Sequence, residues 1–343
     1  MAGPASVNTY HPAPDYRLVV DGRDITPTVD PRLISLTLTE ARGGEADQLD
    51  LEISDHDGDL TIPPKDARIT LALGWAGQPL VDKGSFLVDE VEHSGAPDRL
   101  TIRARSADML RDMRVRSETS WHDTTIGAIV STIAARHGLT PRVDATLAAT
   151  PVAHIDQTHE SDLHFLTRLA RQHDALSTVK NKRLMFLPIN GTKSSAGQAM
   201  PVATITRRDG DQHRYHSADR HAYTGVRAHW HDPGKAEKRS VLAGTGEREK
   251  KLKDTYATEQ DALAAAKAEQ QRVERGKATM ELTLALGRPE LAPQTEVQAR
   301  GFKPEIDATP WLTVKLTHSL GDGGLTTRME LETRAGDSKA GDQ

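Results

Sequence analysis

The chain of 343 residues contains no cysteine and few aromatic residues. Without cysteine it can form no disulfide, and it has no thiolate metal ligand and no cysteine nucleophile. Phe, Tyr and Trp together make up 4% of the residues, which leaves few side chains for the stacked platforms of single-stranded nucleic-acid sites. We therefore expect the aromatic residues to be core anchors.

Long apolar runs and a basic surplus are also lacking. No run approaches the roughly 18 apolar residues that a membrane span needs, and residues 1–14 show no basic start followed by an apolar stretch, so no signal peptide is expected. The formal net charge of −5 disfavours nucleic-acid binding, because phosphate contacts need a basic face. We expect neither a membrane partner nor sequence-specific nucleic acid.

Catalytic and cofactor motifs are incomplete. His159 and His164 have one residue too many between them for the zinc-protease pattern H-E-x-x-H, so on a helix they would not share a face. Residues 55–59 resemble a calcium loop, but Gly58 stands at the wrong position and predicted strands flank the segment. A G-x-S-x-G elbow and a complete P-loop are missing. We predict no catalytic, cofactor-binding or metal-binding residue and no cofactor.

Two local groups of residues leave alternatives open. Five histidines gather in one stretch, and two of them would share a strand face as possible metal ligands or hydrolase residues; otherwise they are exposed polar side chains: His213, His216, His221, His229 and His231. Five arginines form a basic group that could meet an acidic partner surface or line a solvated strand edge: Arg103, Arg105, Arg111, Arg114 and Arg116.

The most informative feature is an internal echo, because residues 86–103 return in outline as residues 311–328. The aromatic starts Phe86 and Trp311 correspond. Six identities follow without a gap, in which Leu87, His93, Ser94, Leu100, Thr101 and Arg103 match Leu312, His318, Ser319, Leu325, Thr326 and Arg328. The echo indicates an internal duplication, so that the chain carries two copies of one β unit.

Patterning divides the chain into three parts. Residues 1–107 alternate in short runs separated by Asp-Gly and Gly-Gly turns, which predicts a β sandwich or barrel. Residues 108–203 predict a small α/β domain with two capped helices and a hairpin. Residues 204–334 return to strands, with a helix at about 258–275 capped by Thr258 and closed by Gly276.

Two segments are expected to lack regular structure. Residues 233–255 are charged and contain several glycines, which predicts a long mobile loop between strands. Residues 335–343 are expected to form a disordered tail.

Several segments resemble the phage late control gene D protein family of tail-hub proteins. Residues 157–175, QTHESDLHFLTRLARQHDA, are similar to its Q-x-x-E-S-D-x-x-F-L-x-R-L-A stretch, which the hub part of type VI secretion spike proteins shares. Residues 225–232 resemble the strand before its variable loop. Its closing pattern is similar to residues 293–302, 306–311, 318–319 and 324–331.

This resemblance implies a mainly β, α+β fold in which two tail-tube-like β-barrel domains flank a small α/β domain. It also implies a non-enzymatic baseplate hub in the virion tail, made and assembled in the bacterial host cytoplasm. The implied assembly is a homotrimer whose pseudo-six-fold ring joins the hexameric tail tube to a trimeric spike. The implied partners are the tail tube protein, the spike protein and, further, the tape measure protein and other baseplate proteins. The alternatives are a hub module of a type VI-like secretion or contractile injection system, and a cell-wall hydrolase that uses the histidines of residues 213–231.

Overall fold

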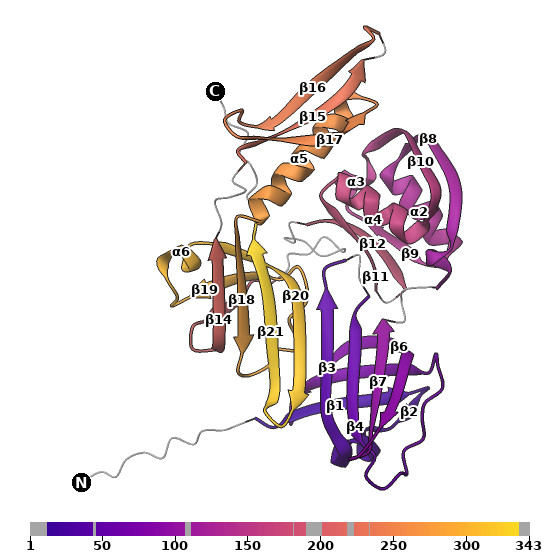
Figure 1. Cartoon of the computed structure of the whole chain (residues 1–343), viewed down its shortest axis with the longest axis vertical. Helices are drawn as coiled ribbons and strands as arrows, with labels where there is room; N and C mark the ends of the chain where they lie inside the picture. Colours follow the sequence, from indigo (N-terminus) through magenta and orange to yellow (C-terminus); the bar gives the residue numbers. More distant parts are fainter. Residues whose placement is uncertain are drawn as a thin grey trace, which may run out of the picture.

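The computed structural model describes residues 12–43, 46–106, 111–180, 182–189, 201–217, 223–232 and 234–335 (Figure 1). Residues 336–343 of the expected tail, and His221, lie outside this range. The described chain is mostly strand, with helices packed beside the sheets, and this confirms the mainly β, α+β class. Among these residues no helix combines the length and the apolar character needed to cross a membrane.

The first β unit contains the strands of the N-terminal part. In sheet order they run β2-β1-β5-β6-β7-β4-β3. Inward apolar side chains from opposite ends of this order, such as Leu18 and Leu38, share one core with the short helix α1, so the sheet curls round on itself. The bounds are β1 (Pro14–Val20), β2 (Arg23–Asp24), α1 (Thr26–Val29), η1 (Asp30–Arg32), β3 (Leu33–Ala41), β4 (Gln48–Ser54), β5 (Arg68–Trp75), β6 (Val81–Ser94) and β7 (Arg99–Ser106).

The second β unit repeats this arrangement in the C-terminal part. Its sheet order is β13-β19-β20-β21-β18-β14, and each strand holds the same place along the chain as its counterpart in β1-β5-β6-β7-β4-β3. One difference is that β13 pairs with β19 in parallel, whereas β1 and β5 are antiparallel. The shared topology confirms two copies of one β unit. The bounds are β13 (Ala203–Thr206), β14 (Gly210–Ser217), β18 (Ala278–Leu284), β19 (Glu296–Arg300), α6 (Pro304–Asp307), β20 (Pro310–Gly321) and β21 (Gly324–Thr333).

A β-bulge marks equivalent positions in β6 and β20. The register shifts between Val88 and Glu90 in β6, and it shifts between Thr313 and Lys315 in β20. The bulges fall at the positions that the sequence echo pairs with each other. A bulge is caused by one extra residue, so its position can be compared exactly between two strands. The equal positions of the two bulges therefore align β6 with β20 residue by residue.

The second strand of each hairpin does not follow the ungapped echo. Ser94 pairs with Arg99, but its counterpart Ser319 pairs with Thr326. By strand pairing, the residue that corresponds to Thr326 is therefore Arg99, whereas the ungapped echo matches Thr326 with Thr101. The second hairpin extends further before it turns. A displacement of two residues keeps the same side chains facing inward. Of the six identities, those in β6 hold, and the matches of Leu100, Thr101 and Arg103 to Leu325, Thr326 and Arg328 are wrong.

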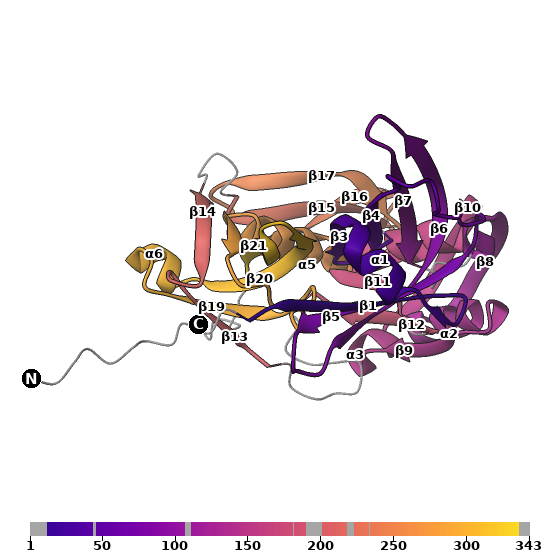
Figure 2. The same cartoon turned by 90° about the horizontal axis from the view of Figure 1, so that it is seen from below.

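The two β units join through direct strand pairing. β3 pairs with β20 from Ala41 opposite Lys315 to Leu36 opposite Leu320, and one 13-stranded sheet results. Figures 1 and 2 show β3 and β20 side by side at its centre. The closed barrels expected from the sequence are not found in the part of the chain that the structure describes. The physical reason is that β3 hydrogen-bonds to the other unit instead of closing on β1.

The central unit packs two helices against two small sheets. β8 pairs with β10, and β11, β12 and β9 form the second sheet. Apolar faces of both helices, with Ile129 and Leu166 fully buried, form its core. The bounds are η2 (Arg111–Arg114), β8 (Arg116–Thr125), α2 (Ile126–Arg136), β9 (Thr140–Val143), α3 (Ala145–Ala148), β10 (Pro151–Ser161), α4 (Asp162–Gln172), β11 (Ala175–Lys180) and β12 (Arg183–Pro188).

The Q-x-x-E-S-D stretch builds the corner between β10 and α4. Ser161 caps α4 by accepting a hydrogen bond from the backbone of His164. The buried Asp162 accepts hydrogen bonds from Gln157 (2.8 Å), Arg136 (2.9 and 3.0 Å) and His137 (2.7 Å). Burial alone would raise the pKa of Asp162, but these donors outweigh it and lower the pKa. The stretch therefore has a structural role.

The charged segment 233–255 is not a loop, which corrects the expectation from the sequence. In its described part, β16 (Glu237–Gly244) and β17 (Glu249–Tyr256) flank β15 (Gly225–Asp232) in a sheet of three strands. Only one face of this inserted layer is apolar: Ala228 and Ala243 pack against Ala262 and Ala266 of α5 (Glu259–Arg275). The other face carries the charges, which hid the strand pattern. Thr258 caps α5 and Gly276 ends it, as the capping pattern predicts.

A buried ionic network lies beneath the β3–β20 junction. Glu40 of β3 bonds to Lys83 of β6 at 2.6 Å and lies 3.7 Å from Lys180 of β11. Its carboxylate is also 3.3 Å from Nε2 of the fully buried His318 in β20. Lys180 reaches Asp47 at 3.0 Å. One carboxylate thus connects both β units with the central unit.

Burial and attraction oppose each other in this network. Burial alone would raise the pKa of Glu40, but His318, Lys83 and Lys180 lower it to about 2. Burial lowers the pKa of His318, so its ring is neutral at pH 7. Burial raises the pKa of Asp47 against the pull of Lys180. Of the two carboxylates, Glu40 is therefore the one whose charged form is stabilised by the network.

A second buried ion pair fixes the inserted layer. Arg275, at the end of α5, is 2% exposed and binds both carboxylate oxygens of Asp174, which follows α4 in the central unit. Its Nε lies 3.1 Å from Glu332 of β21, and Glu332 also bonds to Arg42. Arg275 is thus charge-compensated on both sides, as a buried arginine must be.

Glu40→Gln is expected to destabilise the chain by about 3 kcal/mol at pH 7. This is the free energy that corresponds to the lowering of the Glu40 pKa from 4.5 to about 2 in the folded state. A lowered carboxylate pKa stabilises above the unfolded value of 4.5 and loses its effect as pH falls towards 2. The difference between wild type and variant should therefore shrink from pH 7 to pH 3 in urea unfolding. Glu52→Gln, which removes a partly exposed pair with Arg99, is the control. A pH-independent difference contradicts the assignment.

Asp162→Ala is expected to loosen the corner at the start of α4, because Arg136 and His137 lose their buried partner. We expect a cost of roughly 3 kcal/mol. Hydrogen exchange should show faster amide exchange in α4 with unchanged protection in β3 and β20. The matched control is Asp156→Asn, an exposed carboxylate on β10, the strand that leads into this corner. Unchanged protection of α4 in the Asp162→Ala variant would show that the corner is held in another way.

Candidate assembly surfaces

The four described histidines of residues 213–231 are not brought together. His213 and His216 lie on β14 of the large sheet, where the His213 ring meets Phe302 edge-on at 5.1 Å. His229 and His231 lie on β15, in the inserted layer. In the ranges that the structure describes, no group of three or more metal-ligating side chains occurs. The described histidines of this stretch therefore lie on two separate sheets.

The five arginines also separate. Arg103 and Arg105 of β7 bind Glu90 at 2.8 Å and Asp89 at 3.1 Å on the neighbouring β6. Arg114 and Arg116 lie in the central unit, and the side chain of Arg111 lies outside the described residues. The group predicted from the sequence is thus no single basic patch.

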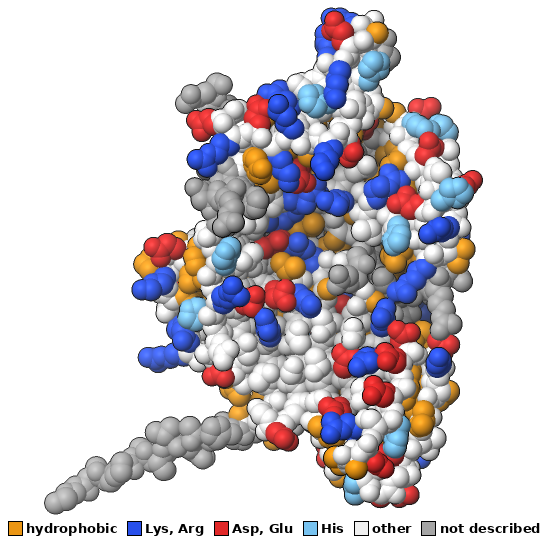
Figure 3. All heavy atoms as spheres, in the orientation of Figure 1, with side chains coloured by type: hydrophobic (Ala, Val, Ile, Leu, Met, Phe, Trp, Pro, Cys, Tyr) orange, Lys and Arg blue, Asp and Glu red, His pale blue; other side chains and the backbone are white. Residues whose placement is uncertain are grey.

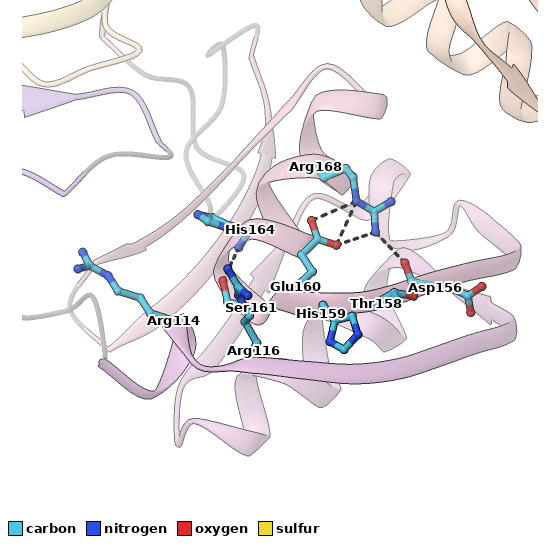
Figure 4. Close-up of a pocket in the computed structure, with 9 residues that line it drawn as sticks. All are labelled: Arg114, Arg116, Asp156, Thr158, His159, Glu160, Ser161, His164 and Arg168. Carbon is cyan, nitrogen blue, oxygen red and sulfur yellow. Dashed lines mark hydrogen bonds and ion pairs between the residues drawn. The ribbon is translucent and has the colours of Figure 1, made fainter.

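A surface pocket of about 690 Å³ is lined by Arg114 and Arg116 (Figure 4). Glu160 faces Arg168 in it and binds this guanidinium at 2.8 Å, and His159 lies 3.1 Å from Glu118. The lining has mixed charge, and its carboxylate at Glu160 is already neutralised. The remaining lining residues are Asp156, Thr158, Ser161 and His164.

A pair of stacked histidines was missed by the sequence analysis. The rings of His122 and His154 lie 4.6 Å apart, with their Nδ1 atoms at 3.0 Å. Nε2 of His154 is 3.1 Å from Asp156. The residues come together only through the β8–β10 register, which no spacing within either segment reveals. All three side chains sit at an exposed strand surface.

Two free strand edges are the most extensive unpartnered features of the sheet. β6 pairs with β5 only up to Leu87, so on that side residues 89–94 have no paired strand among the described residues. β14 pairs with β18 alone in the same part of the chain. Figures 1 and 2 place β14 and β6 at opposite sides of the joined sheet. Free edges offer unused backbone donors and acceptors to another chain.

The side chains of the two edges differ in charge. The exposed residues of β6 include Asp89, Glu90 and Glu92. β14 is exposed from residue 211 to 217 and carries His213, Arg214 and His216. One edge is therefore mainly acidic and the other is partly basic.

Part of the outward face of the joined sheet is uncharged. In Figure 3, few Lys, Arg, Asp or Glu side chains cover the lower part of the area of β3 and β20, while charged side chains lie above it. Thr37 and Thr39 of β3 and Thr317 and Ser319 of β20 alternate with buried leucines there. Charged side chains are more frequent over the inserted layer, where Lys238 and Lys251 are exposed.

Comparisons with known proteins agree with this architecture. The family model described as phage tail baseplate hub (GPD) matches residues 34–324. The chain is 44% identical to the probable baseplate hub protein of Escherichia phage 186, over 95% of this chain and 94% of that protein.

Solved structures share the fold at low sequence identity. The tail protein of Neisseria meningitidis MC58 superposes with a TM-score of 0.69 at 14% identity, covering 93% of this chain and 96% of that one. The E. coli c3393 protein, a component of the type VI secretion system, gives a TM-score of 0.57 at 13% identity, covering 92% of this chain and 76% of that one. The family match and the close relative are decisive: the chain belongs to the phage tail baseplate hub family.

Proposed function

We propose that the chain forms a homotrimeric ring that joins the hexameric tail tube to the trimeric central spike of a contractile phage tail or tail-like particle. Membership of the hub family makes the protein a structural component of the virion tail baseplate, which assembles with other tail components. The observation that carries the finer proposal is the repeated β unit, with the same strand order twice in one chain. Three such chains present six similar units, so a ring of them has near-six-fold and true three-fold symmetry.

The proposed partners follow from this symmetry. A face with six similar units suits the tail tube protein, and a three-fold face suits the spike protein. The tape measure protein and other baseplate proteins are further proposed neighbours. Permanent assemblies of this kind usually bury upwards of about 2,000 Å² per interface, which the broad joined sheet and the inserted layer can supply.

We divide the chain into three functional units. Residues 1–107 and 204–334 are the ring-forming β units, and residues 108–203 are the central unit. The hydrophobic cores support this division, with Leu320 and Leu325 of the second β unit joining the core of the first. The inserted layer has a small core of its own, so it is suited to contacts outside the ring. Residues 233–255 would then serve as a folded contact surface.

A non-enzymatic role fits the chain best. Its relatives are structural hub proteins, and the four described histidines that would serve a cell-wall hydrolase lie on two different sheets. The alternative of a hub module in a type VI-like machine is supported by the shared fold with the c3393 protein. The identity with a phage hub protein over nearly the whole chain favours the phage tail.

The stoichiometry tests the proposal directly. The purified chain of 37.4 kDa should give a mass of three chains by native mass spectrometry, and averaged electron micrographs should show a ring with six similar lobes. Trimerisation should survive His229→Ala with His231→Ala, because these residues lie outside the proposed ring. A purely monomeric or dimeric species at micromolar concentration would contradict the homotrimer.

A further inference from the structure

The β3–β20 junction within the chain has a counterpart in two strand edges that have no partner among the described residues. Within one molecule, β3 of the first unit pairs with β20 of the second. By the shared topology, the counterpart of β3 is β14 and the counterpart of β20 is β6. These are the two free strand edges. The same junction can therefore form once more, but only between two molecules.

We propose that β14 of one chain adds to β6 of a second copy of the same chain, in the antiparallel register that β3 and β20 use within it. This inference rests on the trimeric ring proposed above and specifies its subunit interface. Because the two edges face opposite sides of the molecule (Figures 1 and 2), the contact is head-to-tail. Repetition of a head-to-tail contact closes a ring when the rotation fits.

The bulges determine the register on both sides. In β3 the pairing with β4 shifts between Leu33 and Ser35, and in β14 the pairing with β18 shifts between Gly210 and Gln212. Leu38 therefore corresponds to Tyr215. Together with the bulges of β6 and β20 described above, this makes both edge strands equivalent, residue by residue, to the paired ones.

When the β3–β20 register is applied to the equivalent residues of β14 and β6, it predicts the pairing between two chains. Inside the chain, Leu38 lies opposite His318 and Thr39 opposite Thr317. Between chains, the equivalent positions place Tyr215 opposite His93 and His216 opposite Glu92. The full set of predicted partners is Ser217 with Val91, His216 with Glu92, Tyr215 with His93 and Arg214 with Ser94.

Side chains on the two free edges are more exposed than their counterparts in the internal junction. Leu38 is fully buried in the internal junction, whereas its counterpart Tyr215 is 36% exposed, although its ring meets the core Trp311 edge-on. His318 is fully buried, whereas the side chain of its counterpart His93 is 39% exposed. Stacking the two edges would bring Tyr215 and His93 together on the inward face. Each would then cover apolar surface of the other.

Charge favours a second copy over self-pairing of either edge. On the outward face the internal junction pairs Thr39 with Thr317 and Thr37 with Ser319, and its one charged side chain, Lys315, lies opposite Ala41. The external junction would place Glu92 beside His216 and diagonal to Arg214. Two acidic β6 edges would repel each other, and so would two β14 edges, while the mixed pair attracts. This pattern selects the head-to-tail partner.

Cysteine cross-linking tests the register, because the chain has no cysteine of its own. One double variant carries His93→Cys and Tyr215→Cys, and another carries Glu92→Cys and His216→Cys. Adjacent pairs in an antiparallel ladder alternate between wide and close spacing, so one of the two has cysteines close enough to bond. Mild oxidation should shift the 37.4 kDa band to two-chain and three-chain species on non-reducing gels, and reductant should reverse the shift.

The controls separate this inference from the proposed trimer. Each single-cysteine variant should stay at the monomer band, and so should Glu92→Cys with Gln212→Cys, in which the cysteines would be about 13 Å out of register. A native trimer without cross-linking in either matched pair, or one with disulfide dimers in a single-cysteine variant, overturns the β14–β6 interface and leaves the trimer standing. A wild-type monomer without any cross-linking overturns both.

A charge exchange provides a second test. Glu92→Lys and Arg214→Glu should each weaken trimer formation, by about fivefold per interface, since each places like charges near one another. The combined variant should restore the trimer, because the opposite charges face each other again with exchanged positions. Both residues are exposed, so neither change disturbs the core. Additive weakening in the combined variant would show that the two side chains do not meet.

Discussion

The pairing of β3 with β20 is the constraint on which the rest of the structure depends. It converts two curled sheets into one, and it leaves β14 and residues 89–94 of β6 each with one unpaired side among the described residues. Glu40 stands beneath this junction and connects three units through Lys83, Lys180 and His318. A buried carboxylate is tolerated only when its partners are in place, so the network reports on whether all three units are correctly docked.

Much of the fold could be predicted from local chemistry. The capped helix after Thr258 and the capped corner at Ser161 follow from short-range hydrogen bonds. The echo between β6 and β20 revealed the repeated unit. The ungapped match failed in β7 and β21 because four residues separate Ser94 from its partner Arg99, whereas six separate the equivalent Ser319 from Thr326. An ungapped comparison cannot represent such an insertion.

The surfaces were harder to predict than the core. β14 contains few apolar residues, since it lies at a free edge that no described part of the chain covers. β16 and β17 bury only one narrow face against small alanines, so their charges resemble those of a loop. Conversely, the stretch most typical of the family builds a buried corner around Asp162. A diagnostic motif therefore identified the relatives without marking the interface.

The inserted layer interrupts the repeat at one defined place. It lies between β14 and β18, where the first unit has only the short connection from β3 to β4. In a ring of three chains, every second unit would bear this insertion and its neighbours would not. One surface of the ring would then keep a sixfold pattern while the protrusions beside it alternate. The chain would thus carry the change in rotational order within its own connectivity, and no additional adaptor protein would be needed to create it.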